Sequence, residues 1–151
     1  MPNATITLDP DRNAGKIDRR IFNGFLEHLG RAVYEGIYDP ENPLSDQRGF
    51  RRDVLEVMRQ MRMPYVRYPG GNFVSNYDWK DGIGPADTRP VRADFAWQTS
   101  EPNTFGTDEF MDWCEAAGTA PMMAVNLGTG TAKSAAELVE YCNHPSGTYW
   151  S

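Results

Sequence analysis

Residues 64–72 read PYVRYPGGN, and this stretch decides the fold class of the chain. Residues 65–68 form a short run of aromatic and β-branched side chains, as a strand does. Pro64 ends the helix before it, because the residue preceding a proline is pushed out of the helical region. Residues 69–71, Pro-Gly-Gly, then cut the strand off and open a loop. The stretch therefore predicts the end of a helix, a strand and a turn.

The segments on either side repeat this alternation. A helix is predicted over residues 46–63, where apolar residues recur at helical spacing and charged residues fill the other side. A second helix is predicted from Thr107 as N-cap to Gly118 as C-cap. A third, through about Cys142, is predicted to open on a capping box at 134–137. Further strands are predicted at residues 3–9, 21–26 and 121–126. This order is typical of an α/β domain with a parallel sheet.

Composition restricts the class of protein. The chain has 151 residues, with 15 basic and 21 acidic side chains and a formal net charge of -6. This balance argues against nucleic acid as a partner, since binding a phosphate backbone needs a concentrated basic surface. No apolar run approaches the roughly 18 residues of a membrane span, and the N-terminal residues lack the pattern of a signal peptide. We expect a globular, cytoplasmic protein that binds neither nucleic acid nor membrane.

The two cysteines, Cys114 and Cys142, indicate no site. Each falls within a predicted helix, and neither has a nearby Cys or His at metal-ligand spacing. We interpret both as buried, reduced thiols, which a cytoplasmic setting allows.

Polar groups gather where the predicted parallel strands end, and such ends are where α/β proteins bind ligands. The three ends supply Glu27-His28, Gly70-Gly71-Asn72 and Asn126-Leu127-Gly128. A carboxylate, an opened backbone and amides hydrogen-bond well to hydroxyl-rich molecules. The adjoining loops add aromatic side chains that could stack on sugar rings, namely Phe73, Tyr77, Trp79 and Trp97. The pattern favours a carbohydrate-like ligand over a phosphorylated one.

Each of these residues also has a purely structural interpretation. Glu27 could accept hydrogen bonds from backbone amides, His28 is more often a structural histidine, and Asn126 could cap a strand end. The tryptophans could fill the loops. A nucleotide-binding domain is a further alternative, but after residues 128–130 (GTG) the third glycine position of a dinucleotide loop holds Lys133. The glycines of a Walker loop are replaced as well.

Four longer motifs together resemble the α-L-arabinofuranosidases of glycoside hydrolase family 51. They are residues 25–37 (FLEHLGRAVYEGI), 67–73 (RYPGGNF), 79–85 (WKDGIGP) and 103–111 (NTFGTDEFM). The motifs follow the family's order, and the likeness as a whole covers nearly the whole chain. The resemblance implies an α/β fold of the (β/α)₈ TIM barrel type. Residues 17–151 would form its first part, about three βα units. Residues 1–16 would add a strand to an accessory β-sandwich.

The resemblance also implies an activity, the hydrolysis of terminal non-reducing α-L-arabinofuranosyl groups with retention of configuration. The partners would be arabinofuranosyl oligosaccharides from hemicellulose or pectin, as in arabinan degradation and L-arabinose metabolism. No cofactor or metal is implied, and the full-length enzyme would be a homo-oligomer. Among residues of this chain, the resemblance assigns substrate binding to Glu27, Gly71, Asn72 and Trp97.

No catalytic residue is expected in this chain. The family's acid/base and nucleophile are glutamates on the fourth and seventh strands, so both are expected downstream of residue 151. Glu35, Glu101 and Glu109 are not assigned to these roles. We therefore expect the 151-residue chain to be inactive alone. The alternative is a non-catalytic carbohydrate-binding fragment or pseudoenzyme.

Overall fold

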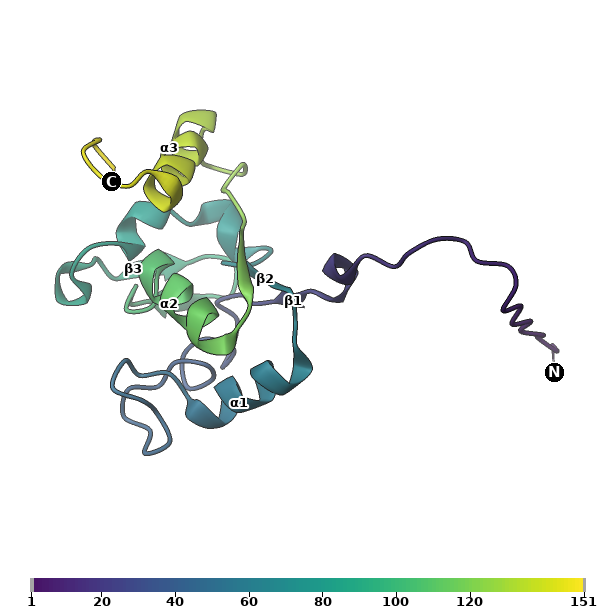
Figure 1. Cartoon of the computed structure of the whole chain (residues 1–151). Helices are drawn as coiled ribbons and strands as arrows, with labels where there is room; N and C mark the ends of the chain where they lie inside the picture. Colours follow the sequence, from purple (N-terminus) through teal and green to yellow (C-terminus); the bar gives the residue numbers. More distant parts are fainter. Residues whose placement is uncertain (1, 151) are drawn as a thin grey trace.

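The computed structural model describes residues 2–150 and is built around a parallel sheet of three strands in the order β1-β2-β5 (Figure 1). The strands are β1 (Gly24–Phe25), β2 (Tyr65–Tyr68) and β5 (Ala120–Met123). Gly24 pairs with Val66 across the first interface, and Tyr65 pairs with Ala120 across the second. Parallel neighbours need a crossover connection, which the intervening helices provide. The predicted α/β class is confirmed.

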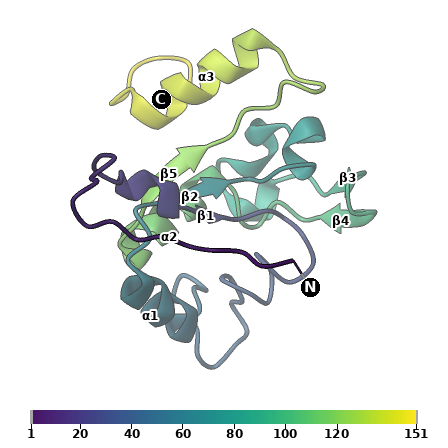
Figure 2. The ribbon, with the colours of Figure 1, turned by 90° about the vertical axis from the view of Figure 1, so that its right-hand side faces the viewer.

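Three α-helices accompany the sheet: α1 (Arg52–Met61), α2 (Thr107–Ala117) and α3 (Ala132–Asn143). Leu55 of α1, Val66 of β2 and Trp113 of α2 belong to one buried core cluster, so both helices pack on the same sheet. Figure 2 shows α3 at the end of the molecule opposite α1, beyond the end of β5. All three strands therefore point their carboxyl ends toward the loops beneath α3.

The bounds predicted from local sequence patterns agree well with β2 and α2. β2 spans the predicted residues 65–68, and α2 ends at Gly118, whose φ of +72° is the left-handed conformation that glycine adopts readily. The predicted N-cap is one residue late. Gly106 is the cap, because the carboxylate of Glu109 reaches back to accept the Gly106 backbone N–H at 2.8 Å.

Two other helix boundaries were wrong for similar reasons. The helix predicted over 46–63 begins only at Arg52, because Asp46 Oδ1 accepts the backbone N–H groups of Arg48 and Phe50 and folds this stretch into a turn. α3 begins before the predicted capping box, because the hydroxyl of Thr131 accepts the Ser134 N–H at 3.1 Å.

The remaining strand predictions were too long. Of residues 21–26 only Gly24 and Phe25 pair in the sheet, since residues 19–22 form the 3₁₀ turn η1 (Arg19–Phe22). The strand predicted at 121–126 ends at Met123. Residues 3–9 form no strand, and Ile6 and Leu8 are 88% and 90% exposed on a segment that extends away from the sheet (Figure 1). A strand needs a hydrogen-bonding partner, and residues 2–150 supply none there. Met1 lies outside the described residues.

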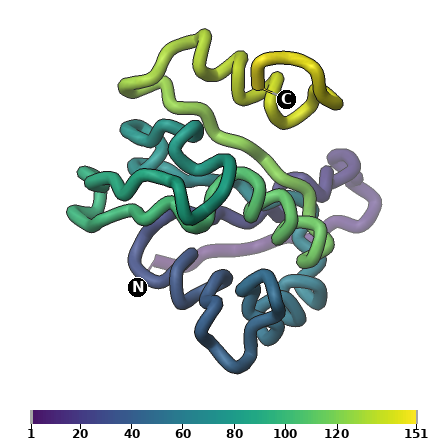
Figure 3. Tube along the Cα trace, turned by 90° about the vertical axis from the view of Figure 1, so that its left-hand side faces the viewer, coloured from purple at the N-terminus to yellow at the C-terminus, as the bar shows by residue number. Residues whose placement is uncertain are grey.

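The loop that opens after β2 continues over residues 69–106 and is ordered by local turns and a hairpin. It contains η2 (Phe73–Asn76), η3 (Trp79–Gly82), η4 (Ala86–Thr88) and the antiparallel strands β3 (Arg92–Asp94) and β4 (Thr99–Glu101). In the trace of Figure 3 this segment lies between α1 and α3. Phe73, Tyr77 and Trp79 bury themselves with Leu138 of α3 in a second core cluster. The loop is ordered because it carries apolar side chains of its own.

The two thiols differ in their surroundings. Cys114 is 1% exposed as predicted, and burial raises the pKa of its thiol to about 12. Cys142 is exposed, contrary to prediction, because it lies on an outer face of α3. Within residues 2–150, no helix combines the length and apolar character that crossing a bilayer requires.

Candidate functional site

Glu27 follows β1 and is held in a close fit against the loop after β2. Its side chain is 7% exposed overall, and its Oε1 accepts the backbone N–H of Phe73 at 2.9 Å. Gly70 has a φ of +130°, and a Cβ placed there would lie 2.3 Å from Glu27 Cγ. Because only glycine combines that conformation with no side chain, Gly70 is what allows the carboxylate to sit here.

The second oxygen of Glu27 is available to a ligand. Among the described residues, none donates a hydrogen bond to Oε2. It faces Gly71, where even a Cβ would remain 3.5 Å away. Asn72 follows on the exposed side, and its amide makes no hydrogen bond within residues 2–150. The structure thus brings together three of the four predicted binding residues.

Arg67 adds a positive charge that the sequence analysis did not single out. Its guanidinium donates a hydrogen bond to the Gly70 carbonyl at 3.1 Å and lies 4.8 Å from the centre of the Phe25 ring. The sequence feature that could have indicated Arg67 is a charged residue within an otherwise aromatic and apolar strand, YVRY. Its neighbours fix this cation at the strand end that carries Gly70.

His28 is a structural residue, as the plainer interpretation held. It is 7% exposed, its Nε2 lies 2.9 Å from the Tyr68 hydroxyl, and its ring stacks on Phe73 with centroids 4.5 Å apart. Its Nδ1 lies 2.8 Å from Glu101 Oε2 without meeting hydrogen-bond geometry. His28 therefore links the end of β1 to the hairpin.

Glu101 is the other half of that link. It is 5% exposed, and its Oε1 accepts hydrogen bonds from the Tyr34 hydroxyl and, at 2.7 Å, from the Asn103 backbone N–H. Burial, together with the Glu101 charge, raises the pKa of Tyr34, which keeps that hydroxyl protonated as a donor. A carboxylate held by several partners is suited to fixing the hairpin in place.

Trp97, the fourth predicted binding residue, lies on the turn between β3 and β4. It is partly buried against the cluster of Phe73, Tyr77 and Trp79, and its indole N–H has no hydrogen-bond partner among the described residues. The same cluster includes Phe73, the residue whose N–H binds Glu27. No hydrogen bond joins Trp97 to Glu27 or Asn72 within residues 2–150.

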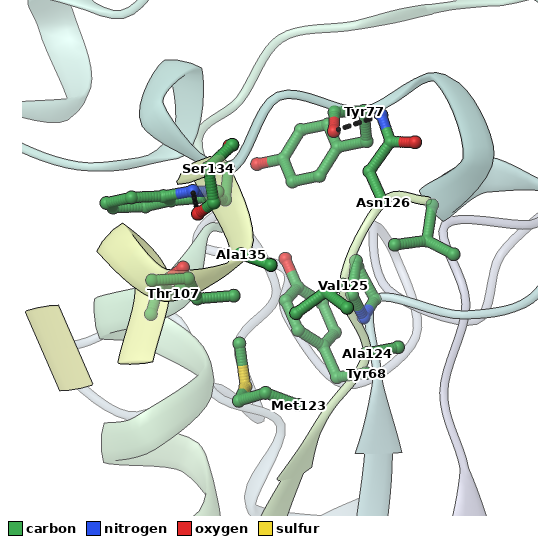
Figure 4. Close-up of a pocket in the computed structure, with 13 residues that line it drawn as sticks. Tyr68, Tyr77, Thr107, Met123, Ala124, Val125, Asn126, Ser134 and Ala135 are labelled. Atoms are coloured by element: carbon green, nitrogen blue, oxygen red, sulfur yellow. Dashed lines mark hydrogen bonds between the residues drawn. The ribbon is translucent and has the colours of Figure 1, made fainter. Parts of the chain in front are cut away.

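Two other candidates serve the architecture. Asn126 Oδ1 accepts the Gly128 and Thr129 N–H groups, and its amide donates to the Tyr77 carbonyl. The Trp79 indole donates to the Ser134 carbonyl at 3.1 Å (Figure 4). The cavity drawn in Figure 4, between these residues, measures about 20 Å³ and has room for about one water molecule. It is too small for a sugar.

The glutamates that the sequence analysis set aside are engaged in ion pairs or hydrogen bonds. Both oxygens of Glu109 bind the Arg89 guanidinium at 2.9 Å, and Glu35 pairs with Arg31 on the surface at 2.7 Å. Within residues 2–150, no group of three or more His, Cys, Asp and Glu side chains is placed to hold a metal ion.

These features define an α/β protein whose ligand-binding groups lie at the carboxyl ends of parallel strands. Comparison with known proteins names the family. The family model described as the alpha-L-arabinofuranosidase 1 domain matches residues 57–151. Two intracellular exo-α-(1→5)-L-arabinofuranosidases are similar to this chain. The one from Halalkalibacterium halodurans is 55% identical over 148 residues, 98% of this chain and 30% of that protein. The one from Bacillus subtilis is 52% identical over 151 residues, 100% of this chain and 30% of that protein.

Solved structures agree. A crystal structure of an arabinofuranosidase matches with a TM-score of 0.89 at 54% identity, covering 94% of this chain and 30% of that one. The arabinose complex of the Thermotoga maritima α-L-arabinofuranosidase matches with a TM-score of 0.85 at 55% identity, covering 87% and 27%. The chain belongs to the α-L-arabinofuranosidases of glycoside hydrolase family 51 and corresponds to their N-terminal portion. It spans about 30% of the length of the curated relatives it matches.

Proposed function

We propose that this chain is the sugar-binding N-terminal part of a retaining α-L-arabinofuranosidase acting on the non-reducing ends of arabinose-containing oligosaccharides. One observation carries the proposal. Glu27 is fixed by Phe73 through one oxygen, while its other oxygen faces Gly71 with no donor from residues 2–150. That oxygen and the exposed Asn72 amide can bind neighbouring hydroxyls of a pentose. The arabinofuranosidase names of relatives 52–55% identical to the chain support the substrate class.

The architecture follows from the same proposal. The three βα units would be the first part of a (β/α)₈ barrel, which takes about 250 residues to close. Adjacent parallel strands in sequence order, joined by helices, support this. Residues 1–16 would contribute a strand to an accessory β-sandwich. The whole enzyme would be a cytoplasmic homo-oligomer needing no cofactor, and the relatives from H. halodurans and B. subtilis are named intracellular.

The catalytic carboxyl groups and the sugar-binding groups of this chain would have different chemical roles. Retaining glycosidases use two carboxyl groups about 5–5.5 Å apart, one as acid/base and one as nucleophile, and we place both outside residues 1–151. This part would supply hydrogen bonds to sugar hydroxyls. Where such bonds tighten in the oxocarbenium-like transition state, each can lower the barrier by about 2–4 kcal/mol. They cannot replace a nucleophile, so the chain alone would bind the sugar without cleaving it.

Titration with L-arabinose, followed by amide NMR shifts, tests the proposal. We expect wild-type binding and at least a tenfold weaker affinity for Glu27→Gln, since a neutral amide is a poorer acceptor than a carboxylate. Glu35→Gln on the surface is the matched control and should bind as wild type. Absence of arabinose binding, or equal affinity of Glu27→Gln, would refute the sugar site. Turnover of an aryl arabinofuranoside by the chain alone would refute the placement of the catalytic pair.

A non-catalytic carbohydrate-binding module would share this site. The coding sequence downstream of Ser151 separates the two. A continuation with an Asn-Glu pair at a fourth strand end supports the enzyme, and a stop codon supports the module.

A further inference from the structure

We propose that a hollow lined by three arginines, at the end of the sheet opposite Glu27, binds the phosphate group of a small molecule. We call this region the arginine hollow. Its volume is about 320 Å³, within the range of about 300–1,000 Å³ typical of small-molecule sites. The lining residues that matter are Arg19, Arg59, Arg62, Met63, Pro64 and Gly118.

The arginine hollow lies where the strands begin. Met63 and Pro64 lead directly into β2, and Gly118 stands two residues before β5. Glu27 instead follows the carboxyl end of β1, and all three strands run parallel. The length of the sheet therefore separates the hollow from the candidate sugar site. A ligand in the hollow is a second ligand and not an extension of the sugar bound at Glu27.

The charge at the arginine hollow is opposite to that of the chain as a whole. Among residues 2–150, three cations and no carboxylate line the hollow, although the formal net charge of the chain is -6. Glu56 lies 3.9 Å from Arg59 Nη1, beyond hydrogen-bond distance, and Asp18 is paired with Arg20 at 2.6 Å. Neither acid lines the hollow. A local excess of positive charge in a concave surface attracts a small anion.

Two of the guanidinium groups are held in place by backbone carbonyls. Arg19 Nη2 donates to the Arg62 carbonyl at 3.0 Å, and Arg59 Nε donates to the Ala116 carbonyl at 2.8 Å. These bonds satisfy carbonyl groups at the ends of α1 and α2, where the helix dipoles favour a cation. A guanidinium carries five N–H donors, so most donors of both arginines remain for a ligand. Capping thus fixes the two cations without using them up.

Arg62 is the third cation, and helix capping does not explain its side chain. It ends α1 with a φ of +51°, a left-handed conformation in which glycine is the usual residue. The cap is made by its backbone N–H, which bonds to the carbonyls of Met58 and Arg59. Its guanidinium makes no hydrogen bond or ion pair within residues 2–150. All of its donors are therefore available at the hollow.

Three guanidinium groups suit a phosphate better than a carboxylate. A phosphate monoester carries about -1.5 to -2 charges and three strong acceptor oxygens at neutral pH. Its tetrahedral oxygens can bind more than one arginine fork, whereas the two oxygens of a carboxylate lie in one plane and match one fork. Met63 and Pro64 add an apolar wall for the organic part of the ligand. A small phosphorylated compound, such as a sugar phosphate, fits this combination.

Calorimetric titration of the chain with inorganic phosphate, ribose 5-phosphate and ribose tests the inference. We expect saturable binding of both phosphate compounds and none of ribose. Arg62→Gln should weaken both at least tenfold and leave the urea midpoint unchanged, since this side chain makes no polar contact within residues 2–150. Arg12→Gln removes the same charge from an exposed residue outside the hollow, and it should bind as wild type. Amide NMR shifts on binding should centre on Met63 and Gly118.

Each outcome decides for or against the site. Tighter binding of ribose 5-phosphate than of inorganic phosphate supports a small organic phosphate as the ligand, and equal affinity supports the free ion. The absence of saturable binding, or unchanged affinity of Arg62→Gln, would overturn the proposal. Equal weakening by Arg12→Gln would show a general charge effect and overturn it too, as would NMR shifts confined to the loop after β2. None of these results bears on arabinose binding at Glu27.

Discussion

Replacing Gly70 by alanine tests the fit between the two segments that carry the candidate site. The substitution has two costs. A φ of +130° is strained for any residue with a Cβ, at about 1–3 kcal/mol. The new Cβ would also lie 2.3 Å from Glu27 Cγ and 2.5 Å from its Cβ, well inside carbon contact distance. Glu27 must then move and lose its bond to Phe73, and a hydrogen bond to a charged group contributes about 1.5–3 kcal/mol.

We therefore expect Gly70→Ala to lower the free energy of unfolding by about 3–5 kcal/mol. Urea unfolding followed by circular dichroism measures this as a midpoint shift of about 1–3 M at unchanged slope. Gly118→Ala is the matched control. Gly118 also has positive φ, +72°, but nothing lies within 4 Å of its would-be Cβ. Gly118→Ala should lower the free energy of unfolding by only the cost of the left-handed conformation for alanine, about 1–2 kcal/mol.

A result that would refute this reasoning is equal destabilisation by the two alanines. The contact with Glu27 would then add nothing, and the carboxylate would be free to leave its position. A second check is arabinose affinity, which Gly70→Ala should reduce under conditions where it remains folded, while Gly118→Ala should not.

Two further predictions concern other parts of the fold. A disulfide reagent should modify Cys142 of the native chain well before Cys114 at pH 8, because Cys142 is exposed whereas burial raises the pKa of Cys114 to about 12. Partial burial and the Asp108 charge also raise the pKa of Cys142, but its thiol stays accessible to the reagent. Cys142→Ser should abolish the faster phase, and a persistent faster phase would contradict the burial of Cys114. Lys80→Met should lower the urea midpoint at pH 7, because the hydrogen bond from Lys80 holds the pKa of Glu137 below its ordinary value of 4.5. A depressed carboxyl pKa stabilises the fold above the unfolded value and loses that effect as pH falls through the folded one, so the two midpoints should converge in strong acid. A difference unchanged by pH would exclude this pair as the cause.

Part of the candidate site was predictable from residues close together in the chain. Glu27, Gly71 and Asn72 each follow a strand, and parallel strands bring their carboxyl ends to one edge. The proximity of these residues could therefore be predicted from the alternation of strands and helices alone. Trp97 was predicted to lie in a loop beside the strand ends, but its orientation toward the Phe73 cluster depends on packing that no local pattern encodes.

What the sequence determined by itself is the set of features that depend on a few neighbouring residues. Gly118 sets the end of α2 through its backbone conformation, and the alternation of apolar segments set the α/β class. The predicted stop at Pro64 was less exact, because α1 already ends at Met61, where Arg62 takes the left-handed conformation. Only the tertiary structure decided which polar side chains are engaged in contacts with distant residues and which remain available to a ligand. Glu101 meets His28 across 73 positions of sequence, and Phe73 meets Glu27 across 46. Such pairs form because folding brings distant segments together, where most buried polar groups find a partner.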